Sequence, residues 1–233
     1  MQITKQCAIC GHKQNYNSKY AVAKFAEPNS LEEKYLFELW HKPALVCSNC
    51  GYASFDTSVC KDRGILNDKQ FLSVNSNGVV NKIEEFKRTK LGDYLKCGSY
   101  YNLIGDNFNE GISYLLASEE VNLAIIHYMR EVSEDVIGGE PDIVEKKLDK
   151  YAEMLFDYGL SRLELLYDEN KYNPDLNILF GGLLISGDEN QLQQGKLVLA
   201  KTLNMLLKPI QKKTCEFLLE KANSTNLNFD DEE

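Results

Sequence analysis

Apolar residues recur every three or four positions through residues 113–223, which is the spacing that places them on one face of an α-helix. In the first such segment the face consists of Tyr114, Ala117, Val121, Ala124 and Tyr128. After a break at residues 138–147, the same spacing continues over residues 148–167. The pattern therefore predicts two long amphipathic helices in this part of the chain.

Three further helices are expected towards the C-terminus. Residues 173–175 (Asn-Pro-Asp) provide a helix start, residues 186–190 form a turn before the next helix, and Pro209 opens the last one. The first of these helices contains Gly-Gly at 181–182 and the second contains Gly195, so the two can approach closely as antiparallel neighbours. This arrangement is typical of a tetratricopeptide hairpin, and a generic helical bundle explains it almost as well.

The first 56 residues show a different pattern, with short apolar stretches in partial alternation. Residues 19–25 and 35–40 are rich in aromatic and β-branched residues, which favours two strands separated by a turn at 26–30. Trp40 is the only tryptophan of the chain, and we expect it to fill the core of a small domain. In residues 57–112 the sequence predicts a turn at 75–78, a charged helix ending near Gly98, and then a loop.

Two Cys-x-x-Cys-Gly motifs lie at the two ends of this N-terminal region, one formed by Cys7 and Cys10 and the other by Cys47 and Cys50. Two intervening residues allow a tight turn to present both sulfurs to one ion. The following glycine permits the positive φ that such a turn needs, and backbone N–H groups can then point at the thiolates. Four thiolates in two such pairs fit tetrahedral Zn²⁺, so we predict one shared metal site.

Other interpretations of the cysteine pairs stay open. Rubredoxin-type iron sites use the same two motifs, and thiolates alone do not separate the two metals. His12 is a weak alternative ligand because it lies too close to Cys10 to serve the same turn comfortably. A thioredoxin-like dithiol is disfavoured because the βαβ context is missing.

The remaining cysteines and histidines stand outside these motifs. The chain has seven cysteines, so at least one is unpaired in any pairing scheme. Cys215 lies on the apolar face of an expected helix and is interpreted as a core residue. Cys60 is interpreted as a spare thiol, with a place near the metal as the alternative because it lies only ten residues after the second motif. Cys97 stands alone and receives no role, and His41 and His127 are interpreted as structural residues.

Together these patterns predict an α+β fold in four parts. Residues 1–56 form a zinc-ribbon-like domain with four cysteine ligands, 57–112 a partly helical connecting segment, 113–223 a tetratricopeptide-like helical domain, and 224–233 an acidic disordered tail.

Charge is distributed unevenly along the chain. Residues 1–100 contain 14 Lys and Arg against 10 Asp and Glu, whereas the remaining residues contain 12 against 25. The acidic second part is a poor candidate for binding nucleic acid, and the first part is only mildly basic. No apolar run long enough to span a membrane and no signal peptide is recognised, so we expect a cytoplasmic protein. In a reducing compartment, closely spaced cysteines indicate metal or redox chemistry.

The segments CAICG, YLFELW and LVCSNCGYASF, together with the later FGGLLISGDENQLQQGKLVLAKTL, resemble the bacterial DUF2225 family. Members of that family look like two cysteine knuckles flanking a strand-rich insert, followed by tetratricopeptide-like helices. The resemblance implies that Cys7, Cys10, Cys47 and Cys50 are the metal ligands, and it implies no particular reaction. The sequence departs from the family at Ala8 and Ser48, where the family favours proline.

The sequence favours a non-enzymatic zinc-binding protein whose helices bind a partner protein. The reasons are a closed set of four cysteine ligands, stacked helices and the absence of known catalytic motifs from the sequence. One alternative is an iron-containing electron-transfer module or a thiol redox sensor at the same cysteines. A second alternative is a zinc ribbon that binds nucleic acid.

Overall fold

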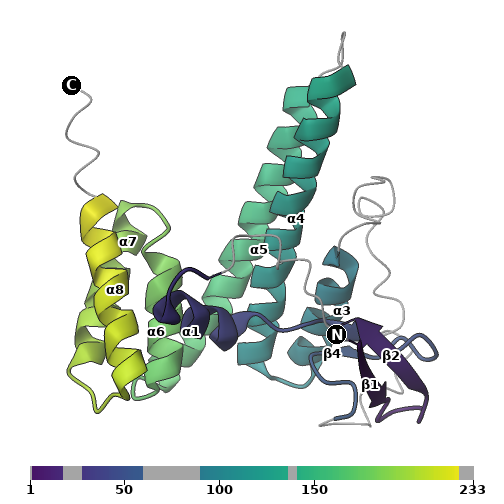
Figure 1. The fold of residues 1–233 in the computed structure, drawn as a ribbon, viewed down its shortest axis with the longest axis horizontal. Coiled ribbons are helices and arrows are strands. Elements are labelled where there is room, and N and C mark those ends of the chain that lie inside the picture. The colour runs from purple at the N-terminus through teal and green to yellow at the C-terminus, as the bar shows by residue number, and fades with distance from the viewer. Residues whose placement is uncertain (1, 18–27, 60–89, 136–140, 226–233) are drawn as a thin grey trace. The chain divides into compact units, whose positions relative to one another are not determined.

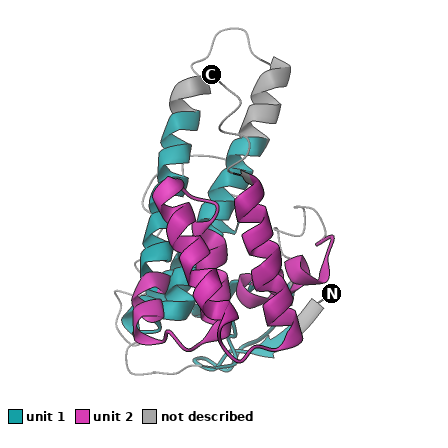
Figure 2. Cartoon of the chain, turned by 90° about the vertical axis from the view of Figure 1, so that its left-hand side faces the viewer, with its two compact units in different colours: residues 1–25, 42–162 teal, residues 26–41, 163–233 magenta. Residues whose placement is uncertain are grey.

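The computed structural model describes residues 2–17, 28–59, 90–135 and 141–225 (Figure 1). Within these ranges the chain forms seven α-helices and two small antiparallel sheets of two strands each. The contacts divide it into two compact units (Figure 2). Unit 1 comprises residues 1–25 and 42–162, and unit 2 comprises residues 26–41 and 163–233.

Unit 1 contains all four strands. β1 (Gln2–Gln6) pairs with β2 (Lys13–Asn17), and β3 (Leu45–Val46) pairs with β4 (Ala53–Ser54). The helices are α3 (Leu91–Leu103), α4 (Asn107–Asp135) and most of α5 (Pro141–Glu169). α3 packs against both α4 and β4, and this contact joins the second sheet to the helices.

α4 and α5 lie side by side in unit 1 (Figure 1). A Cβ atom added at Gly159 of α5 would lie 2.9 Å from the carbonyl oxygen of Gly111 in α4, so the helices need glycine to pack this closely. Nearby, the hydroxyl of Ser118 donates a hydrogen bond of 2.8 Å to the carbonyl of Ala152.

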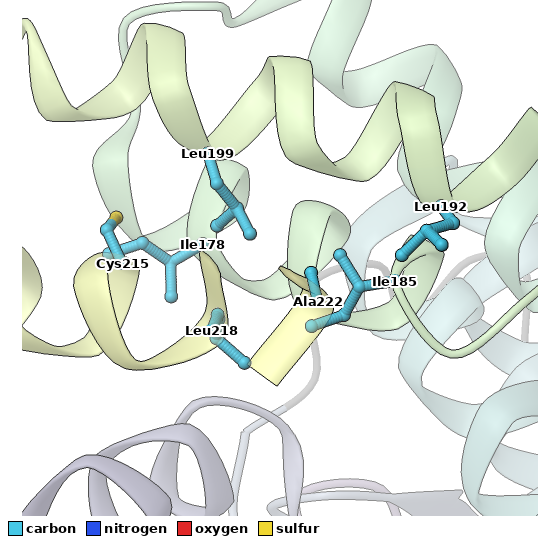
Figure 3. Close-up of a cluster of buried hydrophobic side chains, with 7 residues drawn as sticks. All are labelled: Ile178, Ile185, Leu192, Leu199, Cys215, Leu218 and Ala222. Carbon is cyan, nitrogen blue, oxygen red and sulfur yellow. The ribbon is translucent and has the colours of Figure 1, made fainter. Parts of the chain in front are cut away.

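Unit 2 is helical. It consists of α1 (Leu31–Trp40), the end of α5, α6 (Pro174–Leu184), α7 (Glu189–Leu203) and α8 (Pro209–Thr225). Asn173 caps α6, and Asp188 forms a capping box with Gln191 at the start of α7. The core is a cluster from α6, α7 and α8 (Figure 3), made of Ile178, Ile185, Leu192, Leu199, Cys215, Leu218 and Ala222.

The helices expected from the periodic pattern are confirmed. The close approach predicted at the glycines of α6 and α7 is present, because a Cβ atom on Gly195 would lie 2.9 Å from the carbonyl oxygen of Gly181. The fold is mostly helical with small antiparallel sheets, which is consistent with the α+β class. The tetratricopeptide-like character of the helices stays a prediction.

Two local predictions are wrong. Residues 35–40 belong to helix α1 and not to a strand, because the Ser30 side chain accepts the N–H of Glu33 and caps a helix there. The helix expected to end near Gly98 continues to Leu103, and Gly98 lies inside it, where the missing Cβ leaves room for the Tyr114 ring of α4. The expected loop that follows is short, since α4 already begins at Asn107.

Other predictions fall on residues 18–27, 60–89 and 226–233, which lie outside the described residues. These are the strand at 19–25, the turn at 75–78 and most of the acidic tail. The compact units also differ from the expected ranges, since residues 26–41 group with the C-terminal helices. Whether the sequence-based ranges fold independently stays a prediction. No helix in the described ranges is both long enough and apolar enough to cross a membrane.

Candidate metal centre

Both cysteine motifs form the tip of a β-hairpin with the same backbone plan. In the first hairpin, the N–H of Cys7 donates to the carbonyl of His12 over 2.8 Å, and the N–H of Gly11 donates to the carbonyl of Cys7 over 2.9 Å. In the second hairpin, Cys47 bonds to Tyr52 and Gly51 to Cys47 in the same way, each over 2.8 Å.

The glycine after each motif has the positive φ that the sequence predicts. Gly11 has a φ of 73° and Gly51 a φ of 75°. An L-residue with a side chain rarely adopts this conformation, so glycine allows the chain to turn back into the second strand. The two turns therefore have the same backbone conformation and hold their cysteines in the same way.

The two turns bring all four sulfur atoms together. The Sγ atoms of Cys7, Cys10, Cys47 and Cys50 all lie within 4.8 Å of one another. Cys7 Sγ lies 3.7 Å from Cys50 Sγ, and Cys10 Sγ lies 3.6 Å from Cys47 Sγ. Sulfurs at the corners of a tetrahedron with a central Zn–S distance of about 2.3 Å are about 3.8 Å apart. The observed cluster therefore has the size of a four-thiolate metal site.

Backbone N–H groups point at the sulfurs in a repeated pattern. Cys10 Sγ accepts the N–H of His12, and Cys50 Sγ accepts the N–H of Tyr52. In both motifs the sulfur of the second cysteine therefore accepts the N–H of the residue two positions later. Cys7 Sγ accepts the N–H groups of Ile9 and Cys10. Donors of this kind offset the negative charge of thiolates, as expected for these turns.

The thiols differ in exposure and in acidity. Cys7 and Cys47 are buried, Cys50 is half-buried and Cys10 is exposed. Hydrogen bonds from the Asn49 side chain and from the backbone of His12 lower the pKa of Cys10 to about 6. Burial raises the pKa of Cys7 and of Cys50, and the neighbouring thiols raise that of Cys50 further. A bound cation would favour the thiolate form of Cys7 and Cys50 and so oppose the effect of burial.

Contacts that involve no cysteine side chain also hold the two hairpins together. Gln14 of β2 donates from Nε2 to the carbonyl of Val46 over 2.9 Å, and its Oε1 accepts the N–H of Ser48 over 2.7 Å. The N–H of Ala8 donates to the carbonyl of Thr57 over 2.8 Å. The sulfurs are therefore aligned by the protein itself.

An ion pair lies close to the turn of the first hairpin. Lys5 Nζ is 3.0 Å from an Asp56 carboxylate oxygen, and the backbone and hydroxyl of Ser58 bond to the same oxygen. Partial burial opposes ionisation of Asp56, but these hydrogen bonds outweigh it and lower the pKa of the carboxyl group. The pair adds a further link between the two hairpins.

The four predicted ligands are thus the residues that the fold brings together. His12, the weak alternative, bonds to the first turn through its backbone but is not part of the ligand cluster. Within the described residues, no other histidine, cysteine or carboxylate joins a cluster of three or more ligands. Cys97 is buried in α3, and Cys215 is in the core of unit 2, where burial raises the pKa of its thiol to about 12. Cys60 lies outside the described residues, as do the side-chain surroundings of His127.

Two residues of the site were not predicted from the sequence. Gln14 bridges the hairpins, and Asn49 bonds to the exposed thiol of Cys10. Asn49 lies inside its own Cys-x-x-Cys motif, so its position is the one local signal that was available. Gln14 gives no local signal, because its partners are 32 and 34 residues away.

Comparison with known proteins identifies no family or function for this chain. The chain matches no model of a protein family, no curated protein sequence and no solved structure. Function is therefore inferred from the residues of the site.

Proposed function

We propose that Cys7, Cys10, Cys47 and Cys50 bind one structural zinc ion and that the protein is not an enzyme. The proposal is carried by the two sulfur–sulfur distances of 3.6 and 3.7 Å, which match the edge of a zinc–thiolate tetrahedron. Four protein ligands leave no position on the metal for a substrate or a water molecule. A site of this kind supports folding and not catalysis.

The local structure explains why a metal is useful here. The second hairpin has only two residue pairs, Leu45 with Ser54 and Val46 with Ala53. Isolated two-stranded hairpins are marginally stable in water, and this one is far shorter than an ordinary strand pair. An ion bound to both turns would join the hairpins, so its binding free energy would become folding free energy.

Elemental analysis of the purified full-length protein tests the proposal. We expect one zinc per chain in the wild type and its loss in Cys47→Ala. The matched control is Cys215→Ala, which removes an equally buried thiol from the core of unit 2 and is expected to keep the metal. If the protein contains iron and shows a visible absorption band, the site is a rubredoxin-like iron site and not a zinc site. A wild-type protein without metal would refute the metal site.

We further propose that the helices of unit 2 serve as a protein-interaction scaffold. Tyr172 and Leu206 are large apolar residues that are 91% and 100% exposed. Their loops lie at the same end of the unit, because Asn177 Nδ2 bonds to the carbonyl of Lys171 over 3.0 Å and to the sulfur of Met205 over 3.6 Å. These two strongly exposed apolar side chains at one end of the unit are therefore our candidates for contact with a partner protein.

A crosslinking experiment in cells tests this scaffold. Crosslinked partners that disappear in a Tyr172→Ser, Leu206→Ser variant with unchanged folding would support it, and an identical crosslink pattern would count against it. Membership of the DUF2225 family and a cytoplasmic location belong to the same proposal. They are supported by the two CxxCG motifs and by the sequence composition.

A further inference from the structure

Two short sulfur contacts join one hairpin to the other. Cys10 of the first hairpin contacts Cys47 of the second over 3.6 Å, and Cys7 contacts Cys50 over 3.7 Å. A disulfide bond needs the sulfurs at about 2.0 Å, so each pair would have to close by less than about 2 Å. Each motif would then be linked to the other and not within itself.

Contacts that use no sulfur atom also join the two hairpins. The bonds from Gln14 to Val46 and Ser48, from Ala8 to Thr57 and from Lys5 to Asp56 join the hairpins without using any thiolate. None of these contacts depends on a bound ion, so we expect them to oppose separation of the thiol pairs after the ion is lost.

The exposure of the thiols sets the order of reaction with an oxidant. Cys10 is exposed, whereas its neighbour Cys47 is only 1% exposed. A dissolved peroxide reaches Cys10 first, and Cys47 is the adjacent sulfur on the protected side.

We propose that the metal centre is a peroxide-responsive switch in which the bound ion is exchanged for two disulfide bonds between the hairpins, Cys10–Cys47 and Cys7–Cys50. This inference rests on the metal binding proposed above. In the first step the Cys10 thiolate attacks a peroxide oxygen, the O–O bond breaks, and Cys10 sulfenic acid and hydroxide form. The Cys47 thiolate then attacks the Cys10 sulfur and displaces a second hydroxide, which forms the disulfide.

The electrons balance at each pair. Two thiolates give up two electrons, one peroxide is reduced, and the two hydroxides take up protons to become water. The metal keeps only two thiolate ligands and is released. A second peroxide oxidises Cys7 and Cys50 in the same way, and a thiol reductant reverses both steps.

The pairing can be determined by peptide mapping, because trypsin separates the two motifs. Cleavage after Lys5 and Lys13 yields residues 6–13 with Cys7 and Cys10, and cleavage after Lys34 and Lys61 yields residues 35–61 with Cys47, Cys50 and Cys60. A Cys60→Ala background leaves two cysteines in each peptide. Disulfides between the hairpins join the two peptides, whereas disulfides within each motif leave them separate.

The experiment treats the zinc-loaded, full-length Cys60→Ala protein with hydrogen peroxide and follows zinc with a colorimetric chelator. We expect loss of bound zinc together with a linked peptide that has lost four hydrogens, and fragmentation should assign the pairs Cys10–Cys47 and Cys7–Cys50. A reductant should restore the free peptides and zinc binding. Iodoacetamide should label Cys10 faster than Cys47 in the reduced protein.

The outcomes separate this inference from the proposed zinc site. Disulfides within each motif, the pairing Cys7–Cys47 with Cys10–Cys50, or zinc that peroxide does not release would overturn the switch and leave zinc binding intact. Absence of any bound metal before oxidation would refute the proposed function. The same mapping on the metal-free protein would still decide the pairing.

Discussion

The amide of Gln14 is predicted to set the affinity of the metal centre although it is not a ligand. The substitution Gln14→Ala removes three hydrogen bonds to the second hairpin. Nε2 donates to the carbonyl of Val46 over 2.9 Å, and Oε1 accepts the N–H and the hydroxyl of Ser48 over 2.7 and 2.9 Å. Without them the hairpins are less well aligned before the metal binds.

The size of the effect follows from these bonds. A neutral hydrogen bond contributes about 0.5–1.5 kcal/mol net, and the bonds to Ser48 count for less because that residue is exposed to water. We therefore expect a total of about 1–2 kcal/mol, which corresponds to about a 5- to 30-fold weaker metal affinity. Substitution of residues that position metal ligands generally weakens metal affinity by a factor in this range or slightly above it.

Competition with a chromophoric chelator measures the zinc affinity of wild type and variant. Asn15→Ala is the matched control, because Asn15 lies next in β2 and accepts a 2.6 Å hydrogen bond from Thr4 within the first hairpin alone. If Gln14→Ala binds zinc as tightly as Asn15→Ala, the hairpins are not pre-aligned by Gln14 and the reasoning is refuted.

Three further predictions concern stability, each measured by urea unfolding. Gly195→Ala should lower the free energy of unfolding by about 1–3 kcal/mol, because its Cβ would lie 2.9 Å from a carbonyl of α6, whereas Gly92→Ala has no atom within 4 Å and should raise it slightly. Tyr35→Phe should cost about 1–2 kcal/mol, since the Tyr35 hydroxyl donates to the carboxylate of Asp175; an unchanged midpoint would argue against this contact between α1 and α6. Burial raises the pKa of Glu120 above 4.5, so the folded state binds more protons and wild-type stability should fall as pH rises from there through the folded pKa. The stability difference between wild type and Glu120→Gln should therefore change with pH over that window, and a constant difference would contradict the assignment.

The features that sequence reasoning predicted correctly are those determined by neighbouring residues. A Cys-x-x-Cys-Gly motif specifies its own turn, because the glycine φ and the bonds of the turn involve residues at most five positions apart. The helices α5 to α8 follow from apolar spacing and from caps such as Asn173 and Asp188, which are also local. That the two motifs lie opposite each other was predicted from chemistry alone, because four thiolates fit one tetrahedral metal ion.

The errors arose where distant contacts or weak local signals decide the structure. Residues 35–40 are aromatic and were expected to form a strand, but Ser30 caps a helix whose Tyr35 reaches Asp175. Gln14 is an ordinary polar residue until the second hairpin is placed beside it. Neither relation can be derived from periodicity or composition.

The position of α1 in the chain affects the order in which the protein can fold during synthesis. Both hairpins are complete once Ser54, the last residue of β4, has left the ribosome, so the four cysteines can come together early. α1 emerges between them, but its packing partners α6 and α8 are made only when synthesis reaches residues 174–225. The nascent chain thus carries Tyr35, Leu36 and Leu39 without their native cover through most of translation, and unit 2 closes only after its last helix is released.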